Sequence, residues 1–291
     1  MSSTGLAVSV VMITRNRRSD VMRTLPKLLA LPERPAVIMV DNGSDDGTCD
    51  AVHDTYPNVR VLALGRNAGA AARNVGVRVA STPYVAFADD DSWWERGALS
   101  QAVAVLDAHP RLAVLAGRVR VGQDRIVDPT CIEMACSPLG VRGDLPGPSV
   151  LGFIACGAVV RSRAFLAVGG FDEMLQIGGE EGLLAIDLAA AGWQLCYCDS
   201  VVAIHEPSRM RDRPGRERVI IRNELWSAWL RRPLPAVTRK TARVALAATY
   251  DPQARQALLD ALREAPTVVR RRRPVPPYLE GQLRTLEASS R

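Results

Sequence analysis

The sequence predicts an α/β protein whose mostly parallel central sheet is flanked by helices and followed by a helical C-terminal extension. Continuous apolar, β-branched runs alternate with stretches of helical spacing over the first two hundred residues, as in sheets covered on both faces. Polar residues cluster where these runs end, which is where open α/β sheets bind ligands. Past Pro207 the composition changes to Arg, Leu, Ala and Trp with repeated prolines, which is typical of short helices.

The expected elements follow one another at regular spacing. Strands are expected at residues 6–13, 36–40, 59–64, 84–88, 112–116 and 152–160. Helices are expected at residues 21–31, 69–80, 95–108 and 180–192. Residues 129–149 contain four prolines and three glycines and break the periodicity, so we interpret them as a long loop and a candidate lid over a substrate.

Composition excludes several classes of protein. The 291 residues are 47% hydrophobic and 23% charged, which is ordinary for a globular protein. A chain of this length can bury a hydrophobic core without the support of disulfides or a bound metal. No window holds eighteen consecutive apolar residues, and the first basic residues follow the first apolar run, the wrong order for a secretory signal. Six cysteines without a CxxC pair and three histidines argue against a zinc site. These features predict a cytoplasmic protein with free thiols.

Positive charge is concentrated at the C-terminal end. Residues 1–208 hold 18 Lys and Arg against 23 Asp and Glu, a net −5, whereas residues 209–291 hold 19 against 8, a net +11. Two interpretations stay open for this extension. Trp226 and Trp229 share a helix face with arginines just beyond, which suits peripheral contact with an anionic membrane. Alternatively, both indoles pack onto the rest of the protein. No motif supports specific nucleic-acid binding.

The strongest chemical signal is the acidic triplet Asp89, Asp90 and Asp91 at the end of a predicted strand. Such a cluster is either a solvated turn before a helix or a ligand set for a hard divalent cation. Its position directly after buried strand residues favours Mg²⁺ or Mn²⁺, which can neutralise a nucleotide diphosphate. Trp93 and Trp94 follow the triplet; they are candidates for stacking on sugar or acceptor, although either can equally be core.

Two further polar segments follow predicted strands. In VDNGSDDGT, residues 40–48, Asp41 can accept hydrogen bonds from a ribose or a base; the alternative is a polar loop that caps the next helix. In GRNAGAAARNVGV, residues 65–77, Arg66 and Arg73 can bind phosphate, and the alternative is an Ala-rich core helix. The absence of GxGxxG spacing in this segment argues against a Rossmann dehydrogenase.

A pair of glutamates, Glu180 and Glu181, follows a double glycine at the start of the predicted helix 180–192. One of them can serve as a general base. The alternative is that acidic residues favour helix N-termini because of the helix dipole. The residues of this pair alone do not decide between the two.

Taken in order, these motifs resemble glycosyltransferase family 2, the inverting sugar-nucleotide enzymes with the GT-A fold. The resemblance covers roughly residues 6–208 and rests on VSVVMITRNR, VDNGSDDGT, NAGAAARNVG, FADDDSWWE, and GGFDE followed by GGEE and AAAGW. NAGAAARN and GGFDE look most like the rhamnosyltransferase-like branch. The resemblance implies a GT-A catalytic domain over residues 1–208, with a nucleotide-sugar half at about 1–116 and an acceptor half at about 117–208, before a basic helical extension over 209–291.

The resemblance also implies roles for individual residues. The implied nucleotide pocket is lined by Thr14, Arg15, Asn16, Asp41, Arg66, Asn67, Arg73, Asp89 and Asp90. Asp41 matches the residue that recognises uracil or thymine. Asp89 and Asp91 match the outer carboxylates of the metal-binding DxD motif for Mn²⁺ or Mg²⁺, and His205 resembles a histidine that approaches metal or phosphate.

The same resemblance places the catalytic base. Glu180 and Glu181 stand where the family usually has Glu-Asp, whose second member is the base, so Glu181 is the expected base and glutamate replaces the usual aspartate. Leu183 and Asp187 occupy the places of a further acid and an arginine, so acceptor recognition is expected to differ.

The function implied is metal-dependent, inverting transfer of a sugar from a UDP- or dTDP-sugar donor to the hydroxyl of a glycan, lipid-linked or small-molecule acceptor, in cell-surface polysaccharide or glycoconjugate biosynthesis. Glu181 takes the acceptor proton while oxygen attacks the anomeric carbon from the face opposite the diphosphate. A catalytically weak sugar-nucleotide-binding protein is the alternative, because Glu181 departs from the usual residue. Such an enzyme is expected in the cytoplasm or at the inner face of the membrane.

Overall fold

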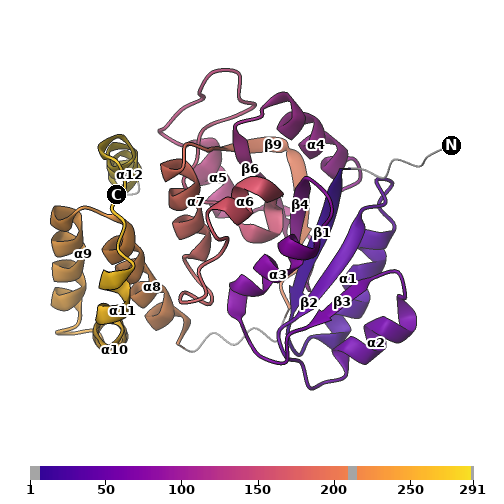
Figure 1. Ribbon diagram of the computed structural model, residues 1–291, viewed down its shortest axis with the longest axis horizontal. Helices are drawn as coiled ribbons and strands as arrows, with labels where there is room; N and C mark the ends of the chain where they lie inside the picture. The colour runs from indigo at the N-terminus through magenta and orange to yellow at the C-terminus, as the bar shows by residue number, and fades with distance from the viewer. Residues whose placement is uncertain (1–6, 209–214, 290–291) are drawn as a thin grey trace.

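The computed structural model describes residues 7–208 and 215–289, and its centre is a single mixed sheet with helices on both faces (Figure 1). Nine strands are found in the described residues, eight of them in the order β3-β2-β1-β4-β8-β6-β9-β5, with β7 paired to β6. The expected α/β class is confirmed by this arrangement.

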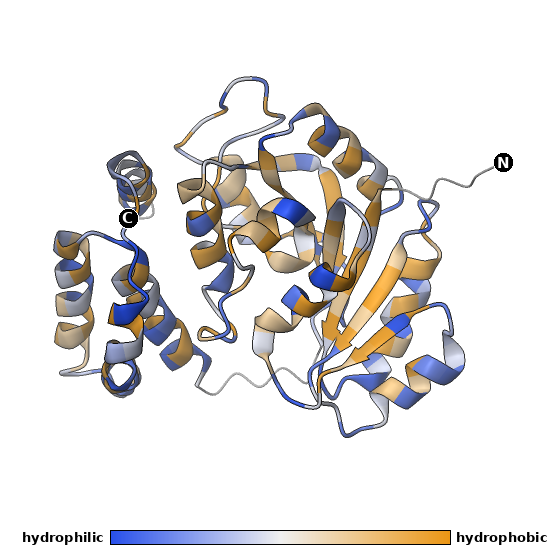
Figure 2. Ribbon diagram, viewed as in Figure 1, coloured by the Kyte–Doolittle hydropathy of each residue, from blue (hydrophilic) through white to orange (hydrophobic). Residues whose placement is uncertain are grey.

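The N-terminal half of the sheet is parallel. Its strands are β1 (Val8–Thr14), β2 (Ala36–Asp41), β3 (Arg60–Ala63) and β4 (Tyr84–Asp89). Successive side chains of β1 enter opposite clusters: Val10 and Met12 pack on one face of the sheet and Val11 on the other. Because both faces are covered, these strands read as unbroken apolar runs, orange in Figure 2.

Helices divide between the two faces. The cluster that contains Met12 also holds side chains of α1 (Arg18–Leu29), α2 (Thr48–Thr55) and α4 (Ala98–Ala108). The opposite cluster holds side chains of α3 (Ala72–Val79), α5 (Pro129–Ala135), α6 (Ser162–Ala167) and α7 (Glu180–Ala190). Burial of both faces stabilises the sheet through the removal of apolar surface from water.

The second half of the sheet is mixed rather than parallel. β8 (Ala158–Arg161) is antiparallel to both β4 and β6 (Leu112–Val121). β9 (Gln194–His205) runs parallel to β6, and its end pairs antiparallel with the short β5 (Ser92–Trp94); β7 (Ile126–Val127) forms a hairpin with β6. The predicted parallel arrangement is therefore found in the N-terminal half of the sheet, and the second half contains both parallel and antiparallel pairs.

Several local expectations need correction. Residues 129–149 are not wholly a loop, because α5 begins them: Asp128 accepts a hydrogen bond from the Thr130 amide at 2.9 Å, and Pro129 occupies the first helical turn. The strand expected from residue 152 begins only at Ala158, after a 3₁₀ turn. The sequence did not predict α2, α6, β5 and β9, because these elements are short or lack a clear periodicity of hydrophobic residues.

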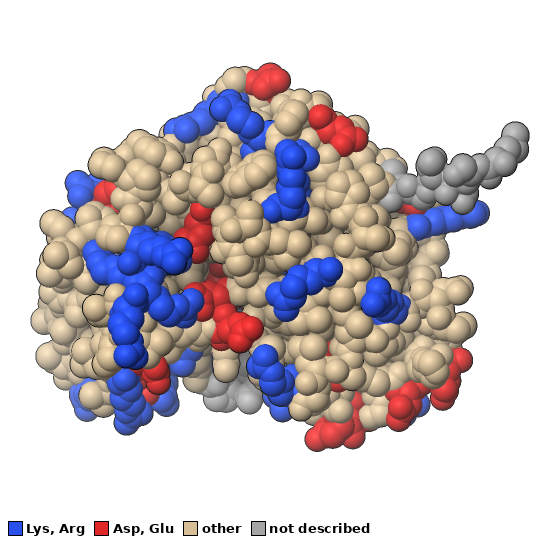
Figure 3. Space-filling model, viewed as in Figure 1, with Lys and Arg blue, Asp and Glu red and all other residues tan. Residues whose placement is uncertain are grey.

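The C-terminal extension is helical, as expected, and lies beyond α7, at the left of Figure 1. Its helices are α8 (Arg216–Arg231), α9 (Leu234–Ala247), α10 (Pro252–Arg263), α11 (Ala265–Arg270) and α12 (Pro277–Ser289). Lysines and arginines gather over these helices in Figure 3. None of the helices in the described ranges has the length and apolar character needed to cross a membrane.

The two tryptophans of α8 face the protein interior. Trp226 and Trp229 are 4% and 8% exposed and share a cluster with Leu175 and Leu183. The indole nitrogen of Trp226 donates to the Ala261 carbonyl at 3.2 Å. The interpretation that places these indoles at a membrane surface is therefore wrong, because one apolar helix face fits a protein core as well as a lipid interface.

The arginines that follow these indoles are also occupied within the protein. Arg231 donates to Asp187 through a nitrogen 2.9 Å from the carboxylate, and Arg232 donates to Glu280 at 2.6 Å. These ion pairs tie α8 to α7 and to α12. Neither guanidinium is available as a lipid contact in this arrangement.

Candidate active site

Three polar strand ends meet at one edge of the sheet. Thr14 of β1 lies beside Asp41 of β2, and Ile13, the residue before Thr14, lies beside Asp89 of β4. Because parallel strands end at the same edge, residues far apart in the sequence form one surface there, at the position where α/β sheets bind ligands.

Asp41 is buried within the loop that it begins. It is 2% exposed and accepts hydrogen bonds from the backbone amides of Gly43 at 3.1 Å and Ser44 at 2.9 Å, as well as from the Ser44 hydroxyl. Its neighbour Asn42 accepts from the Ala68 amide at 3.0 Å and donates to the Gly69 carbonyl at 3.1 Å. Asn42, which the sequence reading did not single out, thus ties the two expected nucleotide loops together.

The loop after β1 contributes both exposed and engaged side chains. The Thr14 hydroxyl donates to Asp90 at 2.9 Å, so β1 and β4 are joined at their ends. Arg15 and Asn16 are exposed, and the Asn16 side chain accepts a hydrogen bond from the Asp45 amide at 2.9 Å.

The loop before α3 contains two of the expected nucleotide residues. Arg66 is exposed and lies 4.0 Å from Glu173. The Asn67 side chain accepts from the Gly69 amide at 3.0 Å, which is a local turn contact. Both residues lie near Gly43 of the Asp41 loop, because a Cβ added at Gly43 would meet the Arg66 backbone at 2.9 Å.

Arg73 lies at the centre of the site. It is 4% exposed and its guanidinium pairs with Asp89, while two aromatic rings, Phe87 and Phe171, lie with their centroids 5.8 Å away. α3 holds Arg73 in place because the next residue, Asn74, donates to the Phe171 carbonyl at 2.8 Å and accepts from its amide at 2.9 Å. The NAGAAARN motif therefore joins directly to GGFDE.

Asp90 points toward β1, and its carboxyl group is a weaker acid than an ordinary aspartate. Burial and the charges of Asp91 and Asp89 raise its pKa from an ordinary 3.8 to about 7. The hydrogen bond from Thr14 and the charge of Arg17 oppose this shift. Arg17 was not among the predicted site residues; it also donates to the Ser208 hydroxyl at 2.7 Å. A basic residue next to the expected TRN motif was the available signal.

Asp91 and His205 form a buried pair. Asp91 is 2% exposed, and one of its oxygens lies 3.2 Å from His205 Nε2, at the end of β9. The Ser208 amide donates to its other oxygen at 3.0 Å. Two of the predicted metal residues, Asp91 and His205, are therefore brought together, because antiparallel pairing of β5 with β9 places Ser92 opposite His205.

Two carboxylates and one imidazole are donors that Mn²⁺ and Mg²⁺ accept, so the residue types fit a divalent cation. As the side chains lie, Asp89 contacts Arg73 and Asp91 contacts His205. Among the described residues, no three His, Cys, Asp or Glu side chains converge into a metal-binding group. The donor chemistry fits, and the two carboxylates contact separate basic side chains, Arg73 and His205.

Glu180 and Glu181 open α7 and lie within electrostatic reach of this cluster. Glu180 is 4% exposed and Glu181 is half-buried. Burial raises the pKa of both carboxyl groups, and the charge of Glu180 raises that of Glu181 further. The positive charge of Arg73 opposes both shifts. The glutamates and Asp89 of the acidic triplet therefore share one cation, Arg73.

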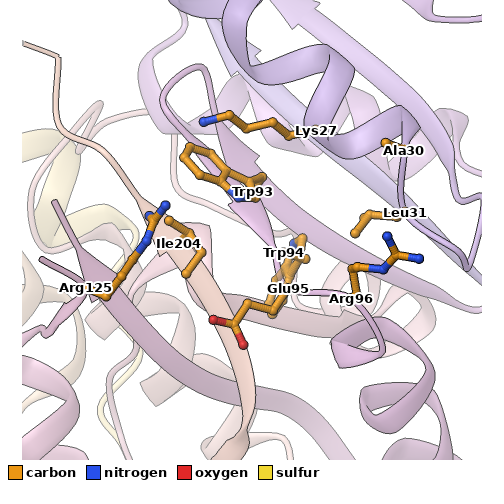
Figure 4. Close-up of a pocket in the computed structure, with 9 residues that line it drawn as sticks. All are labelled: Lys27, Ala30, Leu31, Trp93, Trp94, Glu95, Arg96, Arg125 and Ile204. Carbon is orange, nitrogen blue, oxygen red and sulfur yellow. The ribbon is translucent and has the colours of Figure 1, made fainter. Parts of the chain in front are cut away.

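The two tryptophans after the triplet do not offer free faces for a sugar. Trp94 is 1% exposed and its indole donates to the Phe87 carbonyl at 3.1 Å, so Trp94 is core. Trp93 lines a separate pocket of about 360 Å³, with the Lys27 amine 3.2 Å from its ring centroid (Figure 4). Of the two alternatives left open for Trp94, stacking on a ligand or packing in the core, its burial supports the core.

Comparisons with known proteins place the chain in a family. Residues 9–168, more than half of the chain, match the family described as glycosyl transferase family 2. The N-acetylglucosaminyl-diphospho-decaprenol L-rhamnosyltransferase of Mycobacterium tuberculosis is 28% identical over 270 residues, covering 77% of this chain and 87% of the relative. The pre-mycofactocin glycosyltransferase of the same organism is 31% identical over 221 residues, 72% of this chain and 45% of the relative.

Solved structures show the same fold. A mannosyltransferase from Pyrobaculum calidifontis, in complex with GDP-Man and Mn²⁺, has a TM-score of 0.59 at 20% identity and covers 97% of this chain and 86% of that chain. S. aureus TarS in complex with UDP has a TM-score of 0.55 at 19% identity, covering 88% and 71%. The chain thus belongs to glycosyl transferase family 2 and is a glycosyltransferase with the GT-A fold.

Proposed function

We propose that this protein is an inverting glycosyltransferase that moves a sugar from a UDP- or dTDP-sugar to an acceptor hydroxyl, with Glu181 as general base. The observation that carries the proposal is the position of Arg73, which pairs with Asp89 and also acts electrostatically on Glu181. The residues proposed for the leaving group and the candidate base therefore lie within electrostatic reach of one buried cation, which supports their assignment to a single site.

The nucleotide side of the proposed site is the edge formed by β1, β2 and β4. Asp41 lies at the end of β2, and the two backbone amides that it accepts from fix the loop beside which we place the base and ribose. Arg15 and Arg66 are exposed cations beside this edge and are suited to a diphosphate. We propose that Thr14, Asn16 and Asn67 shape the pocket, because their hydrogen bonds fix the loops that surround it.

Asp89, Asp91 and His205 would hold a divalent cation, Mn²⁺ or Mg²⁺. When bound, such a cation supplies neutralisation of the charge that develops on the leaving diphosphate. Mn²⁺ is present in the related mannosyltransferase structure and in GalNAc-T7 with UDP. Asp89 is the more accessible of the two carboxylates, with 27% of its side chain exposed against 3% for Asp91.

Glu181 is suited to proton removal. Its raised pKa makes it a stronger base than an ordinary glutamate once it is ionised, and its partial exposure leaves it open to an acceptor. Glu180 is buried, and its negative charge disfavours ionisation of Glu181. The charge of Glu180 therefore helps to keep the pKa of Glu181 raised. The base takes the hydroxyl proton as oxygen attacks the anomeric carbon, and no covalent sugar–enzyme intermediate is formed.

We propose a glycan or lipid-linked acceptor. The name of the mycobacterial rhamnosyltransferase describes a sugar on a diphospho-decaprenol, which is a lipid carrier. An acceptor of this kind would place the protein at the cytoplasmic face of a membrane, through surfaces other than the buried indoles of α8.

The test is a screen of nucleotide sugars with Mn²⁺, which follows release of free nucleotide with and without acceptor. We expect turnover of a UDP- or dTDP-sugar by the wild-type protein and loss of turnover, with donor binding retained, in Glu181→Gln. Tight binding of a nucleotide sugar without turnover on any acceptor would favour the sugar-nucleotide-binding alternative. Equal, salt-sensitive affinity for nucleotides of every type would argue against the proposed pocket.

A further inference from the structure

The segment that leads into the two glutamates has an irregular backbone. Gln176, Gly178 and Gly179 have φ values of 57°, 88° and 88°, in the left-handed region that glycine tolerates. Left-handed backbone conformations at three positions prevent the regular backbone hydrogen bonding of a helix or strand. The carbonyl groups of this segment therefore need hydrogen-bond donors from elsewhere in the fold. The conformation of this segment sets where α7 begins, and thereby where Glu180 and Glu181 point.

One side chain of the C-terminal extension supplies these partners. Asn223 of α8 is 0% exposed, and its amide nitrogen donates to the carbonyls of Leu175 at 2.8 Å, Ile177 at 3.0 Å and Gly178 at 2.7 Å. Its side-chain oxygen accepts from the adjacent Arg222 guanidinium at 2.9 and 3.1 Å. The amide orientation is thus fixed, because its oxygen meets a cation and its nitrogen meets carbonyls.

The residue type matters at this position. An aspartate has the same shape but carries no donor, so one carboxylate oxygen would face three carbonyl oxygens. Close packing reinforces the contact: a Cβ added at Gly179 would lie 3.8 Å from the Asn223 Cβ, and one at Gly178 would lie 3.1 Å from Ile220.

The opposite side of the segment is held by the nucleotide half. The Ala70 amide donates to the Gln176 carbonyl at 2.6 Å, and a Cβ added at Gly69 would approach that carbonyl to 2.5 Å. The 3₁₀ turn that contains Ala70 leads directly into α3, which carries Arg73. The segment is therefore clamped between α8 and the turn that precedes the central cation.

We propose that Asn223 is a positioning residue for the glycosyl transfer: from the C-terminal extension it holds the backbone of residues 175–179 so that Glu180 and Glu181 face Arg73 and Asp89. This inference rests on the proposed function, since it assigns a purpose to the position of the base. It makes the helical extension part of the catalytic apparatus rather than an appendage.

The experiment compares Asn223→Ala and Asn223→Asp with Thr241→Val in the full chain. Thr241→Val removes a partly buried hydrogen bond that the Trp229 indole donates at 2.9 Å within the same extension, and this bond does not involve the 175–179 segment. Circular dichroism melts establish that each variant is folded, and amide hydrogen exchange is compared at residues 175–184 and at β1. UDP and dTDP affinity, kcat and its pH dependence are measured with the donor found to be turned over.

We expect faster exchange at residues 175–184 in both Asn223 variants, with β1 unchanged. kcat should fall by about 10²-fold, since small misplacements of a reacting group cost this much, while nucleotide affinity stays within about threefold. The acidic limb of the kcat profile should move to lower pH, because water that enters a loosened segment lowers the pKa of Glu181. Thr241→Val should show none of these effects.

Several results would overturn the proposal. Unchanged exchange at residues 175–184 in folded Asn223 variants would show that this side chain does not hold the segment. Equal losses of kcat in Thr241→Val and the Asn223 variants would show that Asn223 contributes only to the general stability of the extension and does not position the glutamates. If the wild-type protein turns over no donor, the proposed function fails, whereas the exchange arm still decides whether Asn223 fixes the segment.

Discussion

The buried Arg73 of α3 forms an ion pair with the partly exposed Asp89 at the end of β4, and the same guanidinium partly offsets the raised pKa values of the glutamates that open α7. Asp89 of the acidic triplet and both glutamates are thereby influenced by one side chain. Burial is the main cause of the raised pKa values of Asp90, Glu180 and Glu181, and neighbouring carboxylates raise those of Asp90 and Glu181 further.

Replacing the central cation should change the pH dependence of catalysis. In Arg73→Gln, the attraction that lowers the pKa of Glu181 is lost, so this pKa rises further above its ordinary value of 4.5. The base must be ionised to act, and the acidic limb of the kcat profile should therefore move to higher pH. Arg66→Gln, at an exposed arginine, is the matched control and should leave the position of the limb unchanged. A limb at the same pH in both variants would contradict the proposed link.

Metal-dependent nucleotide binding should require Asp91. Asp91→Asn removes one charge beside His205 while keeping the side-chain shape, and we expect the Mn²⁺-dependent gain in UDP or dTDP affinity to fall by about 10- to 100-fold. Calorimetric titrations with Mn²⁺ and with EDTA measure this gain. Asp128→Asn, at the cap of α5, is a control that changes the same charge outside the site. If Mn²⁺ increases nucleotide affinity equally in Asp91→Asn and in wild type, the proposed role of Asp91 in metal binding is wrong.

The two glutamates should separate in a kinetic comparison. Glu181→Gln should lower kcat by about 10²- to 10⁴-fold, because a general base is lost, while donor affinity is preserved. Glu180→Gln removes the like charge that raises the pKa of Glu181, so the acidic limb should shift to lower pH with a smaller change in the maximal rate. Steady-state rates across pH 5 to about 9 measure both effects. A dead Glu180→Gln beside an active Glu181→Gln would place the base one residue earlier.

Asp90 should make the folded protein less stable as pH rises. Its pKa is about 7 in the folded state and 3.8 ordinarily, so the folded protein binds the proton more tightly and loses stability between these two pH values. Asp90→Asn removes this penalty and can still accept from Thr14. The Tm of the variant relative to wild type should therefore rise from about pH 4 to about pH 7 and then level off. Thermal melts in EDTA measure this difference, and a difference that is flat with pH would contradict the burial of this charge.

Trp226 should act on stability rather than on lipid binding. Trp226→Ala empties a buried position between α8, α10 and Leu175, at a cost of about 3 to 5 kcal/mol in the free energy of unfolding. Denaturant titration measures this cost. Co-sedimentation of the folded variant with anionic vesicles should match that of wild type, and a selective loss of vesicle binding would restore the membrane interpretation for this indole.

The order and type of the principal elements could be predicted from the sequence because they depend on local periodicity. β1, β2 and β4 are buried on both faces and therefore apolar throughout, and the polar residues that follow them marked the site edge in advance. The motifs of the first two hundred residues likewise sufficed to indicate the family, since they are contiguous runs whose order along the chain is itself informative.

Other features depended on contacts between residues far apart in the sequence, which no local pattern specifies. Antiparallel pairing of β5 with β9 brings His205 to Asp91, and α8 brings Asn223 to the segment before Glu180. The direction in which an indole points was likewise undecided, because an apolar helix face can be covered by lipid or by protein. Only the packing of α8 against the cluster around Leu175 decided that Trp226 is buried, since it is the partner surface, not the helix, that removes it from water.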